Sequence, residues 1–268
     1  MYDYHTHSFF SDDCSTPARD MIDAACRMGI KEMAITDHYD PDYPDKQYLF
    51  DLDFAGYHKM LNEVKEAYKN KIKIVKGIEI GIQHGDSLEK CKKAANSFDY
   101  DFIIGSFHCA EGYDLYSSRG FYEGRTAEDT YIAFYTYMFN CLKQFKDYDV
   151  IGHFNIIDRY SDEIPGFFVY SDIVEEILKL IIADGKGIEI NTSSFRYGMG
   201  EHTTPTKEIL HLYAKLGGGI VTIGSDAHRA RDLGYRFDYA VEMVRSAGIR
   251  HLAVFDQRKR NLISLDAL

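Results

Sequence analysis

The sequence predicts an α/β fold in which seven or eight parallel strands close into a TIM-barrel-like (β/α) barrel. Two observations support this prediction. Short β-rich runs alternate with helical stretches along the whole chain, which is typical of βαβ units with right-handed crossovers. Histidines and acidic residues recur directly after these runs. An open doubly wound sheet fits the alternation almost as well, but the recurrence favours a barrel, because all strand ends of a barrel meet at one mouth.

The expected strands are short runs of mostly apolar residues. They cover residues 2–6, 32–36, 72–80, 102–106, 150–153, 187–191 and 220–224, with a further short strand at 252–254. The first helix is expected to have Ser15 or Thr16 as its cap, Pro17 at its first position and Gly29 at its end. Thr126 opens a capping sequence for a long helix through about residue 145.

Size and composition are those of a soluble globular protein. The chain has 268 residues, of which 45% are hydrophobic and 27% charged, and we expect one domain over residues 1–268. The first residues lack the pattern of a signal peptide, and no apolar run reaches the roughly 18 residues of a membrane span. We therefore expect a cytoplasmic protein with no membrane partner. Composition does not predict the oligomeric state.

Charge and cysteine content exclude other classes. The net charge of −11 makes a nucleic-acid-binding surface improbable, because phosphate backbones need clustered basic residues. An anionic substrate would need metal ions or a few arginines inside the pocket. The five cysteines are odd in number and never spaced as Cys-x-x-Cys, so we expect reduced thiols.

His5 and His7 are the first sign of a metal site. Residues two apart in a strand project to the same face, so these two imidazoles can converge on one ion. Six of the eleven histidines follow expected strands, together with several carboxylates. Mixed imidazole and carboxylate ligands suit zinc, iron or manganese. Eight or nine donors suggest two or three ions, since each ion takes three or four protein ligands and an open position.

The motifs around these residues resemble those of the PHP (polymerase and histidinol phosphatase) superfamily. The similar blocks are His5-Thr6-His7-Ser8, Thr36-Asp37-His38, Gly77-Ile78-Glu79, Ser106-Phe107-His108, Gly152-His153-Phe154 and Ser225-Asp226-Ala227-His228. They cover nearly the whole chain. The resemblance implies a distorted seven-stranded (β/α) barrel that holds three metal ions.

The resemblance also implies a ligand set for each ion. The first ion would have His5, His7, Glu79 and Asp226, the second Glu79, His108 and His153, and the third Asp13, His38 and His228. Asp12 stands beside Asp13. We prefer Asp13, because it lies six residues after His7, as the family ligand does.

Arg159 and Arg196 narrow the expected substrate. They follow the fifth and sixth strands, and a guanidinium offers a planar fork of donors that matches phosphate oxygens. The two segments resemble the histidinol-phosphate phosphatase branch, in which arginines at these places contact the substrate phosphate. Asn155 departs from the Asp that relatives often carry there.

The resulting prediction is metal-assisted hydrolysis of a small phosphomonoester, L-histidinol phosphate, in histidine biosynthesis. Asp226 or His228 is the expected proton source for the leaving alcohol. Asp40, Asp42 and Glu111 are candidates for binding the cationic end of the substrate. Two alternatives remain: a PHP phosphoesterase that acts on another small phosphomonoester or a nucleotide, and a non-catalytic module that binds metal or a partner.

Overall fold

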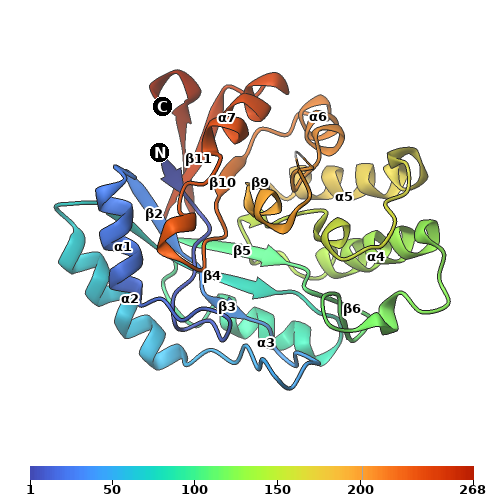
Figure 1. Cartoon of the computed structure of the whole chain (residues 1–268), viewed down its shortest axis with the longest axis horizontal. Helices are drawn as coiled ribbons and strands as arrows, with labels where there is room; N and C mark the ends of the chain where they lie inside the picture. The colour runs from blue at the N-terminus through green and yellow to red at the C-terminus, as the bar shows by residue number, and fades with distance from the viewer. Residues whose placement is uncertain (201) are drawn as a thin grey trace.

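Seven parallel strands form a nearly closed barrel in the computed structural model, which describes residues 1–200 and 202–268 (Figure 1). Their order around the barrel is β1-β2-β4-β5-β8-β9-β10, and β3 pairs with β4. Between the first and last strands, Tyr4 N donates a hydrogen bond to Ile223 O at 2.9 Å. The strands are β1 (Tyr2–Asp3), β2 (Glu32–Ile35), β3 (His38–Tyr39), β4 (Lys73–Gly81), β5 (Phe102–Ser106), β8 (Val150–Ile151), β9 (Gly187–Asn191) and β10 (Val221–Gly224).

Helices pack around the outside of this barrel (Figure 1). Each buries an apolar stripe against the strands, as amphipathic helices of α/β folds do. The α-helices are α1 (Ala18–Arg27), α2 (Phe54–Tyr68), α3 (Asp86–Ala95), α4 (Ala127–Leu142), α5 (Ser171–Ala183), α6 (Lys207–Lys215) and α7 (Phe237–Ser246). The short 3₁₀ helices include η2 (Ile156–Arg159) and η4 (Ser193–Tyr197), and the small hairpin β6 (Cys109–Ala110) and β7 (Tyr113–Asp114) follows β5.

The prediction of a (β/α) barrel is confirmed, and the strands differ from it mainly at their ends. Strand β8 stops at Ile151 because His153 has φ +23°, outside the extended region. Strand β1 is also short, yet Thr6 still forms a parallel bridge with Ala227. The chain thus leaves regular structure where it enters the mouth of the barrel.

One of the two predicted helix starts is wrong. Pro17 precedes α1, and neither Ser15 nor Thr16 caps the helix; the Thr16 hydroxyl donates instead to His228 O at 3.0 Å. Thr126 does cap α4, since its side chain accepts a hydrogen bond from the backbone N–H of Asp129. The α4 helix ends at Leu142, slightly before the predicted end.

The predicted strand at 252–254 is one half of an antiparallel hairpin, β11 (His251–Asp256) and β12 (Lys259–Ser264). Apolar residues of β11 join Tyr4, Phe102 and other barrel residues in a second buried cluster. The hairpin contacts Asp101 and Asp149, the residues just before β5 and β8. It therefore covers the N-terminal end of the barrel, opposite the mouth. Within the part of the chain that the structure describes, no helix is long and apolar enough to span a membrane.

Candidate metal centre and its pocket

Six histidines and three carboxylates meet at the C-terminal ends of the strands. Four groups of three residues each place one ligand atom per residue within 4.8 Å of the others. The groups are His7, His38 and His228; His5, Glu79 and His153; His5, His7 and Asp226; and His38, Glu79 and His108. The structure therefore brings together residues that are up to 223 positions apart in the sequence, from His5 to His228.

Glu79 lies at the centre of this cluster and is fully buried. Its Oε1 is 2.9 Å from His153 Nε2 and 3.4 Å from His108 Nε2. Its Oε2 is 3.0 Å from His5 Nε2 and 3.1 Å from His38 Nδ1. Burial alone would raise the pKa of Glu79, but the surrounding imidazoles outweigh it and hold the pKa well below its usual value. A carboxylate with both oxygens facing different imidazoles is placed to bridge two ions.

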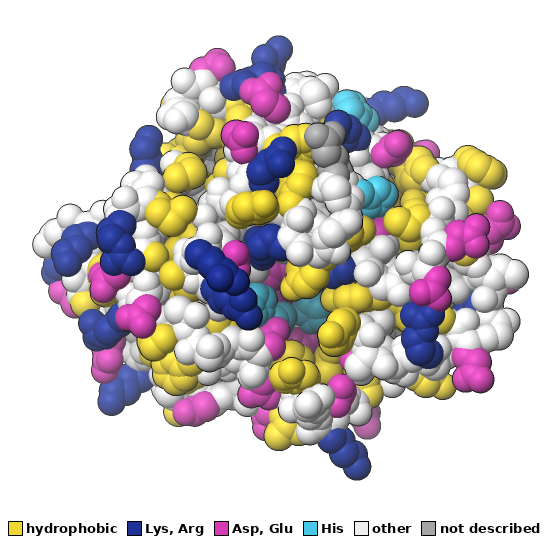
Figure 2. All heavy atoms as spheres, viewed as in Figure 1, with side chains coloured by type: hydrophobic (Ala, Val, Ile, Leu, Met, Phe, Trp, Pro, Cys, Tyr) yellow, Lys and Arg dark blue, Asp and Glu magenta, His cyan; other side chains and the backbone are white. Residues whose placement is uncertain are grey.

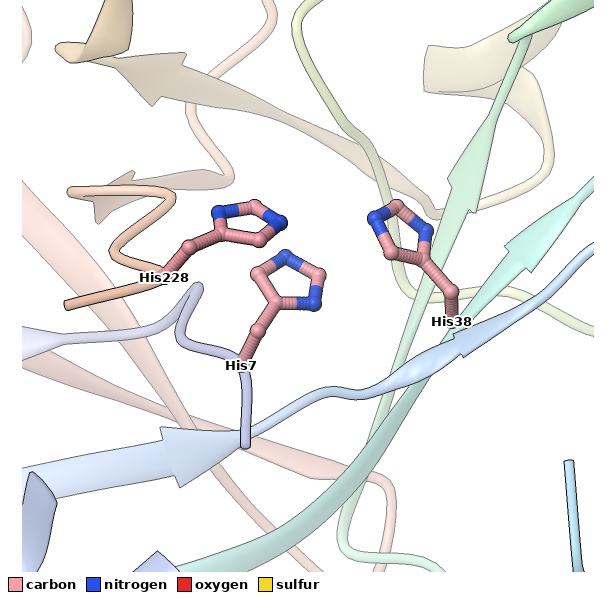
Figure 3. Close-up of side chains that lie close together, drawn as sticks. All are labelled: His7, His38 and His228. Carbon is pink, nitrogen blue, oxygen red and sulfur yellow. The ribbon is translucent and has the colours of Figure 1, made fainter. Parts of the chain in front are cut away.

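His7, His38 and His228 face one another across the mouth from three separate segments (Figure 3). The His7 ring stacks on the other two, with centroid distances of 4.4 Å to His38 and 4.1 Å to His228. Burial and the two neighbouring imidazoles lower the pKa of His7 to about 3, so its ring is neutral. His7 Nε2 is buried and forms no hydrogen bond with any described residue. A neutral, buried imidazole nitrogen without a hydrogen bond, such as His7 Nε2, is a donor that fits a divalent metal ion.

His5 and His7 converge as the sequence predicts. Their ring centroids are 5.1 Å apart, and their Nε2 atoms lie 3.9 and 3.4 Å from the same oxygen, Oδ1 of Asp226. Burial opposes protonation of His5, but the carboxylates of Glu189, Glu79 and Asp226 raise its pKa well above the usual value. These three carboxylates therefore favour the protonated form of His5 when no metal is bound.

The neighbouring residues Asp12 and Asp13 have different surroundings. Asp13 Oδ2 is 3.1 Å from His228 Nε2 and 3.9 Å from His38 Nε2. Asp12 Oδ2 instead accepts hydrogen bonds from the backbone N–H groups of residues 49 and 50. Asp13 is thus the acid of this turn that faces the histidines.

Sequence reasoning missed the residues that orient the candidate ligands. Glu189 Oε1 is 2.7 Å from His5 Nδ1, and its Oε2 accepts a hydrogen bond from the His153 backbone at 2.9 Å. Asp40 Oδ1 is 2.7 Å from His108 Nδ1. Carboxylates that hold the second nitrogen of a metal-binding histidine fix its tautomer and ring orientation. Glu189 carried a signal, because it is the charged residue inside the apolar run of β9.

The two arginines occupy different places. Arg159 lines the pocket; its Nη2 donates to Ser193 Oγ at 2.6 Å, and its guanidinium lies 4.2 Å from the Tyr197 ring centroid. Arg196 is not among the described residues that line the pocket, and its Nη2 donates to the carbonyls of Ser225 and Asp226 at 2.9 and 2.8 Å. Only Arg159 therefore has its guanidinium at the pocket surface.

A pocket of about 350 Å³ opens above the cluster. Figure 2 shows histidine side chains at the floor of a hollow on the viewed face. The floor residues are Asp13, His38, His108, His153, Asp226 and His228, and the wall residues are Tyr43, Asp45, Tyr48, Phe50, Asp114, Tyr116, Ile156, Arg159, Tyr160 and Tyr197.

The acids expected at the cationic end of the substrate lie elsewhere. Asp40 binds His108 beneath the floor, while Asp42 pairs with Lys90 and Glu111 with Arg125. Asp45 and Asp114 are the wall carboxylates instead. The sequence does not fix the orientation of the loops after β3 and β6, and therefore does not show which of their acids line the pocket.

The fold and the site together define a (β/α) barrel protein whose mouth carries a cluster of histidines and carboxylates suited to divalent metal ions. The chain belongs to the PHP domain family, whose model matches residues 3–193.

Relatives match over most of the chain. A probable histidinol-phosphatase of Clostridium acetobutylicum is 31% identical, over 93% of this chain and 95% of the relative. The histidinol-phosphatase of Lactococcus lactis is 29% identical, over 96% of this chain and 95% of its own. A crystal structure of histidinol phosphate phosphatase from Lactococcus lactis, in complex with zinc, L-histidinol and phosphate, superposes with a TM-score of 0.88 at 28% identity. It covers 97% of this chain and 98% of the other.

Proposed function

We propose that this chain is a metal-dependent phosphomonoesterase that hydrolyses L-histidinol phosphate to L-histidinol and phosphate. The observation that carries the proposal is one pocket whose floor is the imidazole and carboxylate cluster and whose wall includes Arg159. The names of the relatives and the ligands of the superposed structure support the substrate. Such a biosynthetic activity agrees with the expected cytoplasmic location.

Two or three divalent ions, zinc, iron or manganese, are the proposed cofactors. We assign His5, His7, Glu79 and Asp226 to the first ion, Glu79, His108 and His153 to the second, and Asp13, His38 and His228 to the third. The contacts of Glu79 with four imidazoles and of Asp13 with His228 support this assignment. His38, which we assign to the third ion, also has its Nδ1 close to the bridging carboxylate of Glu79.

Bound ions of this kind lower the pKa of a water molecule and neutralise phosphate charge. Arg159 holds the phosphate at one side of the pocket, because its planar fork fits two phosphate oxygens. As water adds to phosphorus, the bond to the alcohol oxygen breaks, and that oxygen takes a proton. His228 or Asp226 supplies this proton from the floor. Burial lowers the pKa of His228, but the carboxylates of Asp13 and Asp226 outweigh it and raise that pKa, so His228 can carry the proton. Neighbouring imidazoles hold the pKa of Asp226 well below its usual value despite burial, so Asp226 can give a proton only after it has taken one from the attacking water. The resemblance predicts that Arg196 also contacts the substrate phosphate. We propose that Arg196 contributes to phosphate turnover, and its hydrogen bonds to the carbonyls of Ser225 and Asp226 support an action through that loop.

Two alternatives can be separated from this proposal by experiment. A phosphoesterase for another monoester would not need the acidic residues Asp45 and Asp114 in the wall, which favour a cationic substrate. A non-catalytic module would bind metal without turnover.

A substrate panel tests the proposal. The purified protein is assayed with L-histidinol phosphate, glycerol 2-phosphate, 4-nitrophenyl phosphate and a nucleoside monophosphate, and its metal content is measured on the same sample. We expect the highest kcat/KM for L-histidinol phosphate. Equal values across the panel would reject the specific substrate, and bound metal with no phosphate release would favour the binding module.

A further inference from the structure

One wall of the pocket is a loop without regular structure. Residues 40–53, here called the wall loop, join β3 to α2 and contain no helix or strand. Tyr43, Tyr48 and Phe50 of this loop line the pocket. The Phe50 ring centroid lies 4.9 Å from that of His38. The wall loop therefore brings aromatic surface directly against the candidate metal centre.

Phe50 holds a backbone conformation that a phenylalanine avoids. Its φ is +43°, in the left-handed region. Such a conformation persists only where the surroundings impose it. Here the carbonyl of Phe50 accepts a hydrogen bond from Asp40 N at 3.1 Å, and its N–H donates to Asp12 Oδ2 at 2.9 Å. The backbone N–H and C=O of Phe50 are thus both held by hydrogen bonds, to Asp12 and Asp40 respectively.

Asp12 makes two bonds with a single oxygen. Its Oδ2 also accepts a hydrogen bond from Leu49 N at 2.7 Å. Asp12 belongs to the turn after β1, and the next residue, Asp13, faces His228. In this short turn, Asp13 therefore faces the candidate metal centre, while Asp12 holds the wall loop.

We propose that Asp12 is a positioning residue, which holds the wall loop over the metal centre and thereby sets the affinity for the alcohol part of the substrate. This inference rests on the proposed function for its substrate. It assigns Asp12 a task that needs a hydrogen-bond acceptor and no metal. Because one oxygen accepts both bonds, the amide oxygen of an asparagine can replace it, whereas alanine removes both.

The experiment compares Asp12→Ala, Asp12→Asn and the parent protein. Asp256→Ala, an exposed acid on the hairpin at the other end of the barrel, is the matched control. For Asp12→Ala we expect KM for L-histidinol phosphate to rise about tenfold, which corresponds to about 1.4 kcal/mol. We expect kcat, metal content and the inhibition constant of inorganic phosphate to stay within about twofold, since the proposed phosphate contacts, Arg159 and the metal centre, lie outside the wall loop. Asp12→Asn and the control should match the parent.

Limited proteolysis gives a readout that needs no substrate. Lys46 is exposed at the tip of the wall loop, so trypsin cleavage after it reports how firmly the loop is held. Cleavage should be about tenfold faster in Asp12→Ala and unchanged in Asp12→Asn. Metal loss in both Asp12 variants would overturn the inference in favour of Asp12 as a ligand. It would also be overturned by unchanged KM and cleavage in Asp12→Ala, or by a phosphate inhibition constant that rises in step with KM. If the parent hydrolyses no L-histidinol phosphate, the proposed function fails and the cleavage rates alone decide the inference.

Discussion

The substitution Glu79→Gln tests the centre of the cluster with a minimal change of shape. It keeps the side-chain volume and removes one negative charge from a position where four imidazole nitrogens lie within 3.4 Å of the two carboxylate oxygens. Ser106 Oγ also donates to Oε1 at 2.6 Å. In the glutamine variant, the amide nitrogen would replace one carboxylate oxygen. It would then face hydrogen-bond donors of the surrounding side chains, and it cannot accept their hydrogen bonds.

The expected loss of stability in Glu79→Gln follows from the full burial of this side chain. Breaking a buried ion pair by removing one partner costs about 3–5 kcal/mol. The lower end, about 3 kcal/mol, applies here because the histidines can lose their protons once the carboxylate charge is gone. For a chain of this size each kcal/mol shifts Tm by about 2–4 °C, so metal-free Glu79→Gln should melt about 6–12 °C below the metal-free parent. The proposed bridge predicts that the variant also binds at least one metal ion fewer.

Thermal unfolding in the presence of a chelator measures the first effect, and elemental analysis of the repurified protein measures the second. Asp149→Asn is the control, because Asp149 is a buried acid paired with Arg258 at the opposite end of the barrel. It should lower Tm while metal content stays at the parent level. A Glu79→Gln protein with the metal stoichiometry of the parent would refute the bridging role, whatever its Tm.

Three further predictions concern residues around the cluster. Arg159→Lys keeps the positive charge and loses the planar fork of guanidinium donors. In steady-state assays, kcat/KM for the phosphomonoester should fall about tenfold, while elemental analysis should show unchanged metal content. A hydrogen bond to Asp158 raises the pKa of His202, so His202 stabilises the fold below its unfolded pKa and this contribution disappears as pH rises through the folded value. Because His202 is 35% exposed, we expect only about 1 kcal/mol, seen as a Tm loss between pH 6 and 9 that is absent in His202→Gln. Tyr4→Phe removes the hydroxyl that accepts a hydrogen bond from Phe255 N at 2.7 Å, and should lower the free energy of unfolding by about 1–3 kcal/mol in denaturant titrations while kcat stays unchanged.

Local patterns predict the fold and the position of the mouth well. Short apolar runs such as that of β5 indicate strands, because strands of a parallel sheet are buried on both faces. The C-terminal ends of all barrel strands meet at one mouth, which we call the strand-end rule, and this rule predicts that His7, His38 and His228 come together, as they do. It depends only on the parallel direction of the strands, and the contacts of Glu79 agree with it.

Residues that orient the ligands are harder to predict, since their partners are set by tertiary contacts. Asp40 follows His38 by two residues, yet its Oδ1 lies 2.7 Å from Nδ1 of His108, which comes just after β5. The β11–β12 hairpin was only half predicted, because β12 is mostly exposed and carries a weak apolar pattern in Lys259–Ser264. Neither feature has a signal at a fixed spacing along the chain.

The two arginines show the limit of the strand-end rule itself. Arg159 ends η2 after β8, and Arg196 lies inside η4 after β9, so each is carried by a 3₁₀ turn at the same mouth. Successive residues in such a turn differ in direction by about 120°. A difference of one residue in where the turn begins therefore decides whether a guanidinium faces the pocket or the backbone behind it. The rule predicts which end of the barrel a side chain occupies, and the local turn decides what that side chain contacts.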